Sequence, residues 1–498
     1  MEKTGGDTGR TVQGRSPWMV LIVTSIAALT AVFNGSTLNV ALPTLMRVLH
    51  APVTDIGWVM MSYMVIMAVA VVHAGKLADR LGRKRVFLIG MAIFAAGALA
   101  SGFARNVAAL IAFRALQALG GATVMANSTA IVTDAFPADR RGSALGINGM
   151  VIGAGSVVGP IIGGVLLSVA SWQWIFWFNV PIACVVLLLG SRILPHYPSN
   201  PRHRRFDVWG TLALVVGLLA LLGAITYGTL MGWGHPLIVA LLLLGGLACG
   251  GFWEAERHAE DPIIRFALFR RRGYAVGHVS VFLNALARMS VMFLMIFYLQ
   301  GARGYTPLQA AIVMIPMALP MMILGPIAGS LSDHIGSRLL TSGGLFLAAI
   351  GLWGMSTVGD HSSILYVAIW LAVIGAGSGL FNSPNTVSIM NSVPNDYRGV
   401  AAGTRTMLNN LGMLFSLSVT VGLMGAVLPN TNVFAAAHGA SAFPTGPFLH
   451  TTHLIFWGAT LINVVAAVLS MFRESKPPKS RPRSQRMHLP VQVGHAAH

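Results

Sequence analysis

Charged residues and cysteines are both scarce in this 498-residue sequence. Only 10% of the residues are charged and 55% are hydrophobic, whereas a soluble globular domain carries about a quarter charged residues. This composition excludes an ordinary soluble domain and indicates an integral membrane protein. The two cysteines, Cys184 and Cys249, are too few for a disulfide framework or a zinc site.

Carboxylates are the rarer of the two charge classes. The sequence holds 15 Asp and Glu residues, and every one falls in a tail, in a loop or near the end of an apolar run. No carboxylate is therefore predicted at the centre of a bilayer. The HExxH, paired-carboxylate and phosphate-binding glycine-loop patterns of enzymes are also missing. We therefore predict that the protein is not an enzyme, and we expect no cofactor and no metal site.

The 33 Lys and Arg residues give a net charge of +18, and most of them fall in loops and tails on one predicted side of the membrane. This asymmetry predicts a multi-pass protein of the cytoplasmic (inner) membrane with both termini in the cytoplasm. It argues against nucleic acid as a partner, and the basic tail is expected to contact membrane lipid. The exceptions are predicted in outer loops (Arg47, Arg105, Arg303) and in membrane helices (Arg114, Arg288, Arg405).

Two short loop patterns occur twice in the chain. The loop Gly75–Arg85 returns in part as Gly329–Arg338, shifted by 254 residues, and Pro137–Gly142 returns as Pro394–Gly399, shifted by 257. Two unrelated patterns with nearly the same offset indicate two homologous halves. In membrane proteins this is the arrangement of transporters that alternate access around a central site.

The apolar runs predict an all-α integral membrane fold of about fourteen helices, since roughly 20 apolar residues cross a bilayer. The repeat offset places six helices in each half and two inserted helices between the halves. The predicted regions are a tail at 1–17, a half at 18–195, a linker with the inserted helices at 196–272, a half at 273–472 and a basic tail at 473–498. The predicted helices are Trp18–Val40, Thr54–Ala74, Val86–Phe103, Val107–Ile131, Ser143–Val169, Trp174–Leu194, Val208–Gly228, Leu237–Trp253, Ala275–Tyr298, Leu308–Leu331, Leu339–Val358, Ser363–Met390, Val400–Leu428 and His450–Phe472.

The loop Gly75–Arg85 resembles the signature loop between the second and third helices of the major facilitator superfamily. The layout narrows this resemblance to its fourteen-helix drug:proton antiporter family, of the multidrug efflux type. A glycine pattern in the fifth predicted helix is similar to the antiporter signature of that family. With a spacing of four, such glycines share one face where another helix can approach closely, so a packing role and an antiport role both stay open. The pattern consists of Gly155, Gly159, Pro160, Gly163 and Gly164.

The resemblance implies two six-helix bundles that rock around a midplane cavity in a monomer. It implies efflux of drugs, with antibiotic resistance as a consequence, in exchange for protons. It also implies that the repeated loops form a cytoplasmic gate, with Gly75 and Gly82 in a tight turn. The gate residues are Gly75, Asp79, Arg80, Gly82 and Arg83, and in the second copy Asp333, Gly336 and Arg338.

One position departs from the family pattern in a way that bears on coupling. The first helix of the family carries a proton-linked Asp where this chain has Asn34, and an amide cannot titrate. Asp134 and His73 are the nearest possible proton carriers. Asp134 can equally be a helix-end residue that pairs with Arg140 or Arg141, and His73 can equally be a satisfied interface residue.

Polar residues at membrane depth are costly and are therefore candidates for a substrate cavity. Arg288 has no acid in its own helix, so it is expected to face the cavity or to pair with carbonyl groups. A cavity with cations and no acids favours neutral or anionic amphiphiles. The cavity candidates are Asn34, Arg114, Gln117, Asn284, Arg288, Asn382 and Asn385, with an adaptable lining from Trp58, Met61, Met64, Phe282, Met292, Tyr298 and Phe381.

These observations predict a secondary transporter that exports amphipathic small molecules, drug-like or lipid-like, with protons as the possible coupling ion. Two alternatives remain open. Asn34 is compatible with an uncoupled facilitator or importer. The incomplete second loop is compatible with a receptor or scaffold that no longer transports.

Overall fold

A computed structural model describes residues 16–137, 140–195, 208–259, 264–394, 397–428 and 443–473, and the side chains of some residues within these ranges, including Asp333 and several in α5, lie outside the description. All regular structure in the described part of the chain is helical, as predicted. Helices close their own backbone hydrogen bonds, which a segment surrounded by lipid requires. Thirteen of the described helices are long and apolar enough to cross a membrane, and α5 adds a shorter apolar stretch at Gly153–Val169.

Residues 17–193 form α1 to α7 and residues 272–471 form α10 to α15, with α8 and α9 between them in sequence. The bounds are α1 Pro17–Leu49, α2 Val53–Leu81, α3 Arg83–Gly102, α4 Val107–Ala135, α5 Arg141–Val169, α6 Trp174–Trp177, α7 Asn179–Ile193, α8 Val208–Met231, α9 Pro236–His258, the 3₁₀ turn η1 Phe266–Arg270, α10 Arg272–Phe297, the π turn η2 Tyr298–Ala302, α11 Pro307–Ile335, α12 Ser337–Met355, α13 Ile364–Asn391, α14 Arg398–Val427 and α15 Thr445–Met471.

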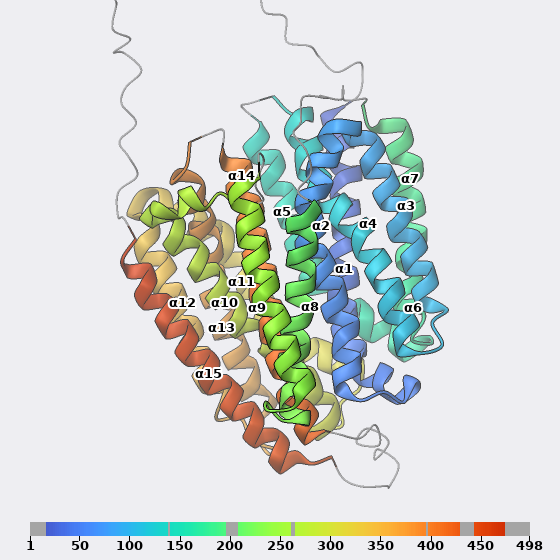
Figure 1. The fold of residues 1–498 in the computed structure, drawn as a ribbon, viewed down its shortest axis with the longest axis vertical. Helices are drawn as coiled ribbons and strands as arrows, with labels where there is room; N and C mark the ends of the chain where they lie inside the picture. Colours follow the sequence, from blue (N-terminus) through green and yellow to red (C-terminus); the bar gives the residue numbers. More distant parts are fainter. Residues whose placement is uncertain are drawn as a thin grey trace, which may run out of the picture.

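The two groups of helices stand side by side and meet along two seams. Figure 1 shows α1–α7 on the right and α10–α15 on the left. Helix α2 packs against α14 at one seam, and α5 packs against α11 at the other. Helix α1 also contacts α10 and α11, so the two halves face each other between these seams as well.

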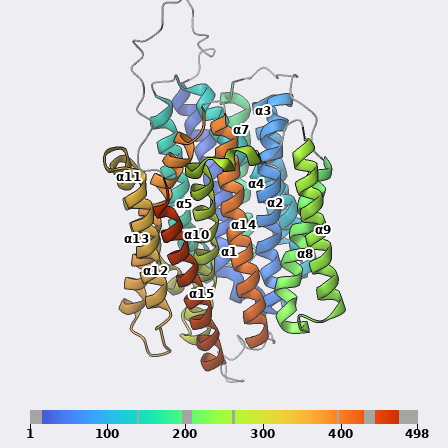
Figure 2. The ribbon, with the colours of Figure 1, turned by 60° about the vertical axis from the view of Figure 1, so that its left-hand side comes forward.

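The inserted pair α8 and α9 covers the outside of the α2/α14 seam (Figure 2). Helix α8 is bonded to both halves: the Tyr227 hydroxyl donates to Asp55 of α2 (3.2 Å), and Thr229 donates to the carbonyl of Gly422 in α14 (2.6 Å). Helix α9 packs on α8 and exposes residues such as Leu243 and Leu247. The pair is therefore an addition to the outside of the bundle.

The repeated loops are shorter than the sequence predicts. Helix α2 continues to Leu81 and α3 begins at Arg83, so only Gly82 (φ +93°) separates them. The second copy has the same geometry, with Gly336 (φ +85°) alone between α11 and α12. The prediction that Gly75 belongs to the turn is wrong, because Gly75 lies inside α2. A glycine is needed only where φ is positive.

Other predicted bounds are also corrected. Helix α1 runs to Leu49, past the predicted end at Val40, and the sixth predicted helix is divided at Phe178 into α6 and α7. The predicted tail begins with Arg473, yet this side chain is 2% exposed and belongs to the folded bundle. Hydropathy marks the apolar core of a helix, whereas polar helical ends continue beyond it.

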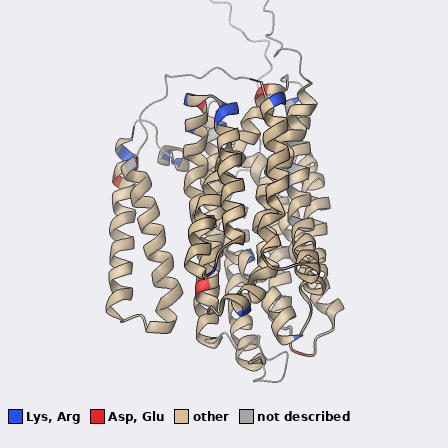
Figure 3. Cartoon of the chain, turned by 90° about the vertical axis from the view of Figure 1, so that its right-hand side faces the viewer, with Lys and Arg blue, Asp and Glu red and all other residues tan. Residues whose placement is uncertain are grey.

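Charge is distributed unequally along the bundle. Figure 3 shows Lys and Arg gathered at one end, which we call the basic end; it carries the α2–α3 junction. The described carboxylates all lie near helix ends or in a loop: Asp55, Asp79, Asp134, Glu254, Glu256 and Asp360. The structure therefore places no described carboxylate at the middle of a spanning helix.

Candidate functional site

The two halves touch closely at the end opposite the basic end. A Cβ on Gly57 of α2 would lie 2.7 Å from the side chain of Val421 in α14, and a Cβ on Gly164 of α5 would lie 2.7 Å from the Cα of Leu308 in α11. Such distances mean that the helices are in direct contact there. The Gln300 amide of η2 also donates across the boundary to the carbonyl oxygen of Val40 in α1 (2.9 Å). This end of the interface is closed.

The same helix faces are open at the basic end. Gly75 follows Gly57 by 18 residues, and Gly403 precedes Val421 by 18 residues. Eighteen residues make five turns of 3.6 residues and about 27 Å of helix, so each glycine lies on the same face as its counterpart. A Cβ at either glycine would meet nothing within 4 Å. Helices α2 and α14 thus meet at one end and separate toward the other.

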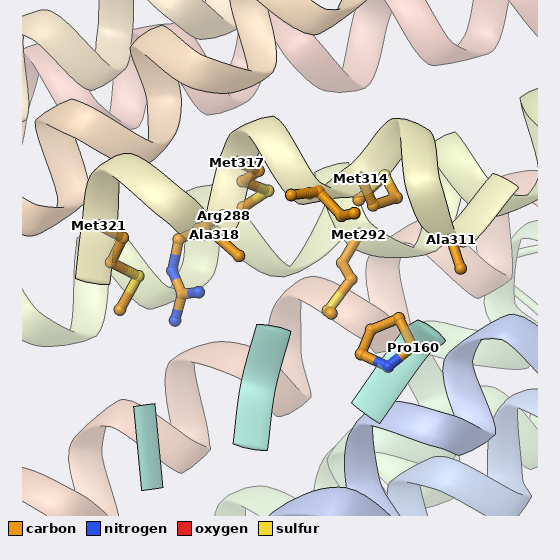
Figure 4. Close-up of a pocket in the computed structure, with 9 residues that line it drawn as sticks. Pro160, Arg288, Met292, Ala311, Met314, Met317, Ala318 and Met321 are labelled. Atoms are coloured by element: carbon orange, nitrogen blue, oxygen red, sulfur yellow. The ribbon is translucent and has the colours of Figure 1, made fainter. Parts of the chain in front are cut away.

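A cavity of about 70 Å³ lies between the halves at the α5/α11 seam (Figure 4). Pro160 comes from the first half, and the other lining residues come from α10 and α11. Four of the nine lining residues are methionine, four are other apolar residues, and one is a charged residue. The lining residues are Pro160, Arg288, Met292, Ala311, Met314, Ile315, Met317, Ala318 and Met321.

Arg288 is the cation of this cavity. It lies near the middle of the spanning segment Arg272–Ala302. Its guanidinium has no hydrogen bond, ion pair or ring contact with any residue that the structure describes, and its Nε atom is buried without a partner. A guanidinium in this position attracts negative charge, and no described carboxylate lies there to satisfy it.

Arg114 is held differently, inside the first half. One of its terminal nitrogens donates to the side-chain oxygens of Asn34 and Gln117, both at 2.8 Å. Its guanidinium lies 4.2 Å from the centre of the Tyr63 ring, which adds a cation–π contact. These residues are all buried and none lines the cavity. The predicted cavity residues Asn34, Arg114 and Gln117 therefore form an internal cluster.

The predicted asparagines of the second half are also internal. Asn284 donates to Asn463 of α15 (3.2 Å), Arg405 donates to Asn382 (3.3 Å), and Arg473 donates to the buried Asn385. Burial lowers the pKa of Arg473 to about 10, which leaves it charged at neutral pH. Of the predicted cavity residues and predicted lining, the structure places only two in the cavity walls, Arg288 and Met292.

The glycine pattern of α5 lies in close contact with two neighbouring helices, α1 and α11. A Cβ on Gly155 would lie 2.7 Å from Leu29 of α1, Gly163 lies against the backbone of Thr37, and Gly159 faces Ser36. The adjacent Pro160 lines the cavity and Gly164 touches α11. The pattern therefore provides close packing within the first half and contact with the second.

At the basic end, Arg83 holds together two acids of the first half. It lies 3.1 Å from Asp79 and 2.5 Å from Asp134, and it donates to the carbonyl of Ala130. The partner predicted for Asp134 was Arg140 or Arg141; its observed partner is Arg83, because the α2–α3 junction lies over the end of α4. Arg80 is half-buried, Arg338 is exposed, and the Asp333 side chain is outside the described residues.

His73 and His278 both occupy contacts between helices. The His73 ring meets the carbonyl of Val69 (2.9 Å) and the hydroxyl of Thr211 in α8 (2.6 Å). The His278 ring lies 2.8 Å from the carbonyl of Tyr274 and 3.3 Å from that of Ala401 in α14. Neither histidine lines the cavity.

Sequence reasoning missed the methionines of α11. Met314, Met317 and Met321 recur at spacings of three and four, so they share one helix face. That periodicity is visible in the sequence and could have identified them. The sequence could not show that this face of α11 and Arg288 of α10 line the same cavity.

Comparison with known proteins identifies a matching family model and several similar transporters. A family model described as "Major Facilitator Superfamily" matches residues 24–417 and 277–495 in two overlapping matches. The riboflavin transporter RibZ of Clostridioides difficile is 29% identical, covering 94% of this chain and 99% of the relative. The tetracenomycin C resistance and export protein of Streptomyces glaucescens is 30% identical, covering 83% of this chain and 77% of the relative.

A solved structure shares the fold. It is the crystal structure of a bacterial homolog to the human lysosomal transporter Spinster, in an inward-facing and unoccupied conformation. It superposes with a TM-score of 0.65 at 15% identity, covering 92% of this chain and 97% of that chain.

Proposed function

Because this chain belongs to the Major Facilitator Superfamily, we propose that it exports amphipathic small molecules, drug-like or lipid-like, by alternating access across the cytoplasmic membrane. Membership makes it a multi-pass secondary transporter rather than an enzyme. The substrate class, the direction of transport and the orientation of the chain are the proposed parts.

The observation that carries the proposal is the unequal contact along the α2/α14 seam. The seam is closed at Gly57 and Val421, and the same faces are open 18 residues away at Gly75 and Gly403. A transporter that alternates access must close one end while the other is open. The enrichment of cations at the basic end supports a cytoplasmic position for that end, and this conformation would then be open to the inside.

Two features support export of amphiphiles. The cavity at the seam is lined by methionines, whose flexible side chains adapt to varied apolar groups. Among the similar proteins, one is named as a resistance and export protein for tetracenomycin C and another as a riboflavin transporter. Export is therefore an activity that the name of one relative states.

The alternative of an uncoupled facilitator or importer is favoured by one contact. Asn34, at the position of the proton-linked acid in the drug antiporters that this chain resembles, accepts a hydrogen bond from Arg114 (2.8 Å). The amide satisfies the cation permanently and carries no proton. Antiport would then need another titrating group, such as Asp134 or His73.

Two glycine substitutions test alternating access. Gly57→Leu places a side chain against Val421 and should prevent closure of the end opposite the basic end. Gly75→Leu meets open space in this conformation and should prevent closure of the basic end. Uptake of a fluorescent amphiphile into inside-out vesicles, with and without a proton gradient, should fall at least about tenfold in both variants, a change of about 1.4 kcal/mol.

The same variants should trap opposite conformations. A cysteine introduced at Met321, after replacement of Cys184 and Cys249, reports which side reaches the cavity through its reaction with an impermeant maleimide. We expect faster reaction from the outside in Gly57→Leu and from the cytoplasm in Gly75→Leu. Wild-type uptake in both variants, with unchanged labelling, would refute the proposed mechanism.

A further inference from the structure

We infer that the cavity at the α5/α11 seam binds an amphiphile that carries one carboxylate, with the carboxylate on Arg288 and the apolar body on the methionines of α10 and α11. This inference rests on the proposed transport function and adds the charge and class of the substrate. No acid of the protein competes for Arg288 among the described residues.

The charge of the ligand follows from the state of Arg288. Its guanidinium carries five N–H donors, yet it has no protein acceptor within the described structure, and its Nε is buried. A guanidinium left unpaired at membrane depth is unfavourable, so ligands that supply negative charge gain the free energy of pairing. A carboxylate suits the site because it accepts two parallel hydrogen bonds from the planar guanidinium. A cationic drug would be repelled.

Other arginines of the bundle differ from Arg288 in their terminal nitrogens, although the Nε atoms of Arg114 and Arg473 are also buried without a partner. Arg114 has two amide oxygens and an aromatic face, and Arg473 has the side-chain oxygen of Asn385. The fold therefore can provide acceptors for a buried guanidinium. Around Arg288 the fold places methionine side chains, which are at most weak acceptors, in the cavity wall.

The size and lining of the cavity define the rest of the ligand. About 70 Å³ accommodates a carboxylate but not a complete drug-sized molecule, whose pockets are roughly 300–1,000 Å³. Figure 4 shows Arg288 beside Met321, with Met292 next to Pro160 farther along the seam. An apolar body would extend along this row, since methionine side chains can rearrange around it.

Binding to the purified full-length protein tests the inference with two probes of nearly the same size, one anionic and one neutral. One probe is an 11-carbon carboxylic acid with a terminal dansyl group, and the other is its primary amide. We expect the acid to bind wild-type protein at least about tenfold more tightly, which corresponds to about 1.4 kcal/mol. Arg288→Gln should remove this preference, and Arg288→Lys should retain part of it because the charge remains.

A matched control removes a cation far from the cavity. Arg105 is exposed beyond the end of α3, so Arg105→Gln changes the net charge equally and should keep the full preference. Equal binding of acid and amide to wild-type protein would overturn the inference without any variant. An equal loss of preference in Arg105→Gln would also overturn it, because general charge would then be the cause.

Flux measurements separate this inference from the proposed function. In inside-out vesicles, Arg288→Gln should still move the neutral amide while its transport of the acid falls to the same level. If wild-type protein moves acid and amide equally, transport stands and the anion assignment fails. If it moves neither probe nor any other amphiphile, the proposed function itself fails.

Discussion

Each half of the bundle has an arginine within a spanning helix, and the surroundings of the two arginines differ: Arg114 is buried and Arg288 is half-buried. In the first half, Arg114 is fixed by Asn34, Gln117 and the face of Tyr63. In the second half, Arg288 faces a cavity among methionines without a bonded partner in the described structure. The two arginines therefore have different surroundings: polar and aromatic partners around Arg114, and a largely apolar cavity around Arg288.

The repeated loops show the same divergence. In the first half, Arg83 joins Asp79 to Asp134. In the second copy, the residue at the position of Arg83 is Ser337, so an equivalent ion pair cannot form there. The two copies of the loop therefore differ in the ion pairs that they can form.

Replacing each arginine by methionine should give the largest difference between the halves. Arg114→Met removes two charge-assisted hydrogen bonds and leaves two buried amide oxygens unpaired, a loss of about 2–4 kcal/mol. Arg288→Met removes no hydrogen bond and abolishes the desolvation cost of a charge, so stability should stay equal or rise. Thermal unfolding of the purified proteins in one detergent measures both.

An equal loss of stability in the two variants would contradict this comparison. It would mean that Arg288 has a structural partner after all. Arg105→Gln, which alters an exposed cation, provides the baseline for the effect of charge alone.

Replacing Asn34 by Asp should have a smaller effect on stability and should change coupling. The carboxylate would lie where the amide oxygen now accepts from Arg114 at 2.8 Å, and a paired charge is favoured in a buried site. We expect a gain of about 1 kcal/mol at neutral pH, the size of a typical net hydrogen-bond contribution. Uptake of a neutral amphiphile should then become dependent on a proton gradient.

If wild-type transport already requires the gradient, the coupling group lies elsewhere. Asp134→Asn and His73→Gln then identify it. Gradient-independent uptake by Asn34→Asp would show that an acid at this position is not sufficient for coupling.

Asp79→Asn should have the smallest effect on stability. Asp79 and Arg83 are about one-third and one-quarter exposed, and such ion pairs contribute about 0–1 kcal/mol. Transport should nevertheless fall strongly, because the loop is proposed to hold the basic end closed in the other conformation. Vesicle uptake, normalised to the amount of folded protein, measures this loss.

The equivalent change Asp333→Asn is the internal control for the gate. The second loop lacks the arginine at position 337, so its acid should matter less. Normal transport by Asp79→Asn would remove the gate role from the first loop.

Several features could be predicted because they depend on short segments. The repeats identified two halves, and a glycine that requires positive φ identified the turn at Gly82. Hydrogen-bond and ion-pair partners that lie far apart in the chain could not be predicted from short segments. The contact between Asn34 and Arg114 spans 80 residues, and the pairing of Arg83 with Asp134 spans 51 residues.

The sequence by itself determined the membrane class, the helical fold and the family, because hydrophobic runs, cation placement and repeated loops are local properties of the chain. Only the tertiary structure decided which of the predicted polar residues line the cavity between the halves. Asn34 and Arg288 are equally plausible cavity residues in the sequence, since each interrupts an apolar helix. Packing gives Asn34 an arginine partner and leaves Arg288 facing the space between the halves, because a side chain's partners depend on how whole helices are arranged.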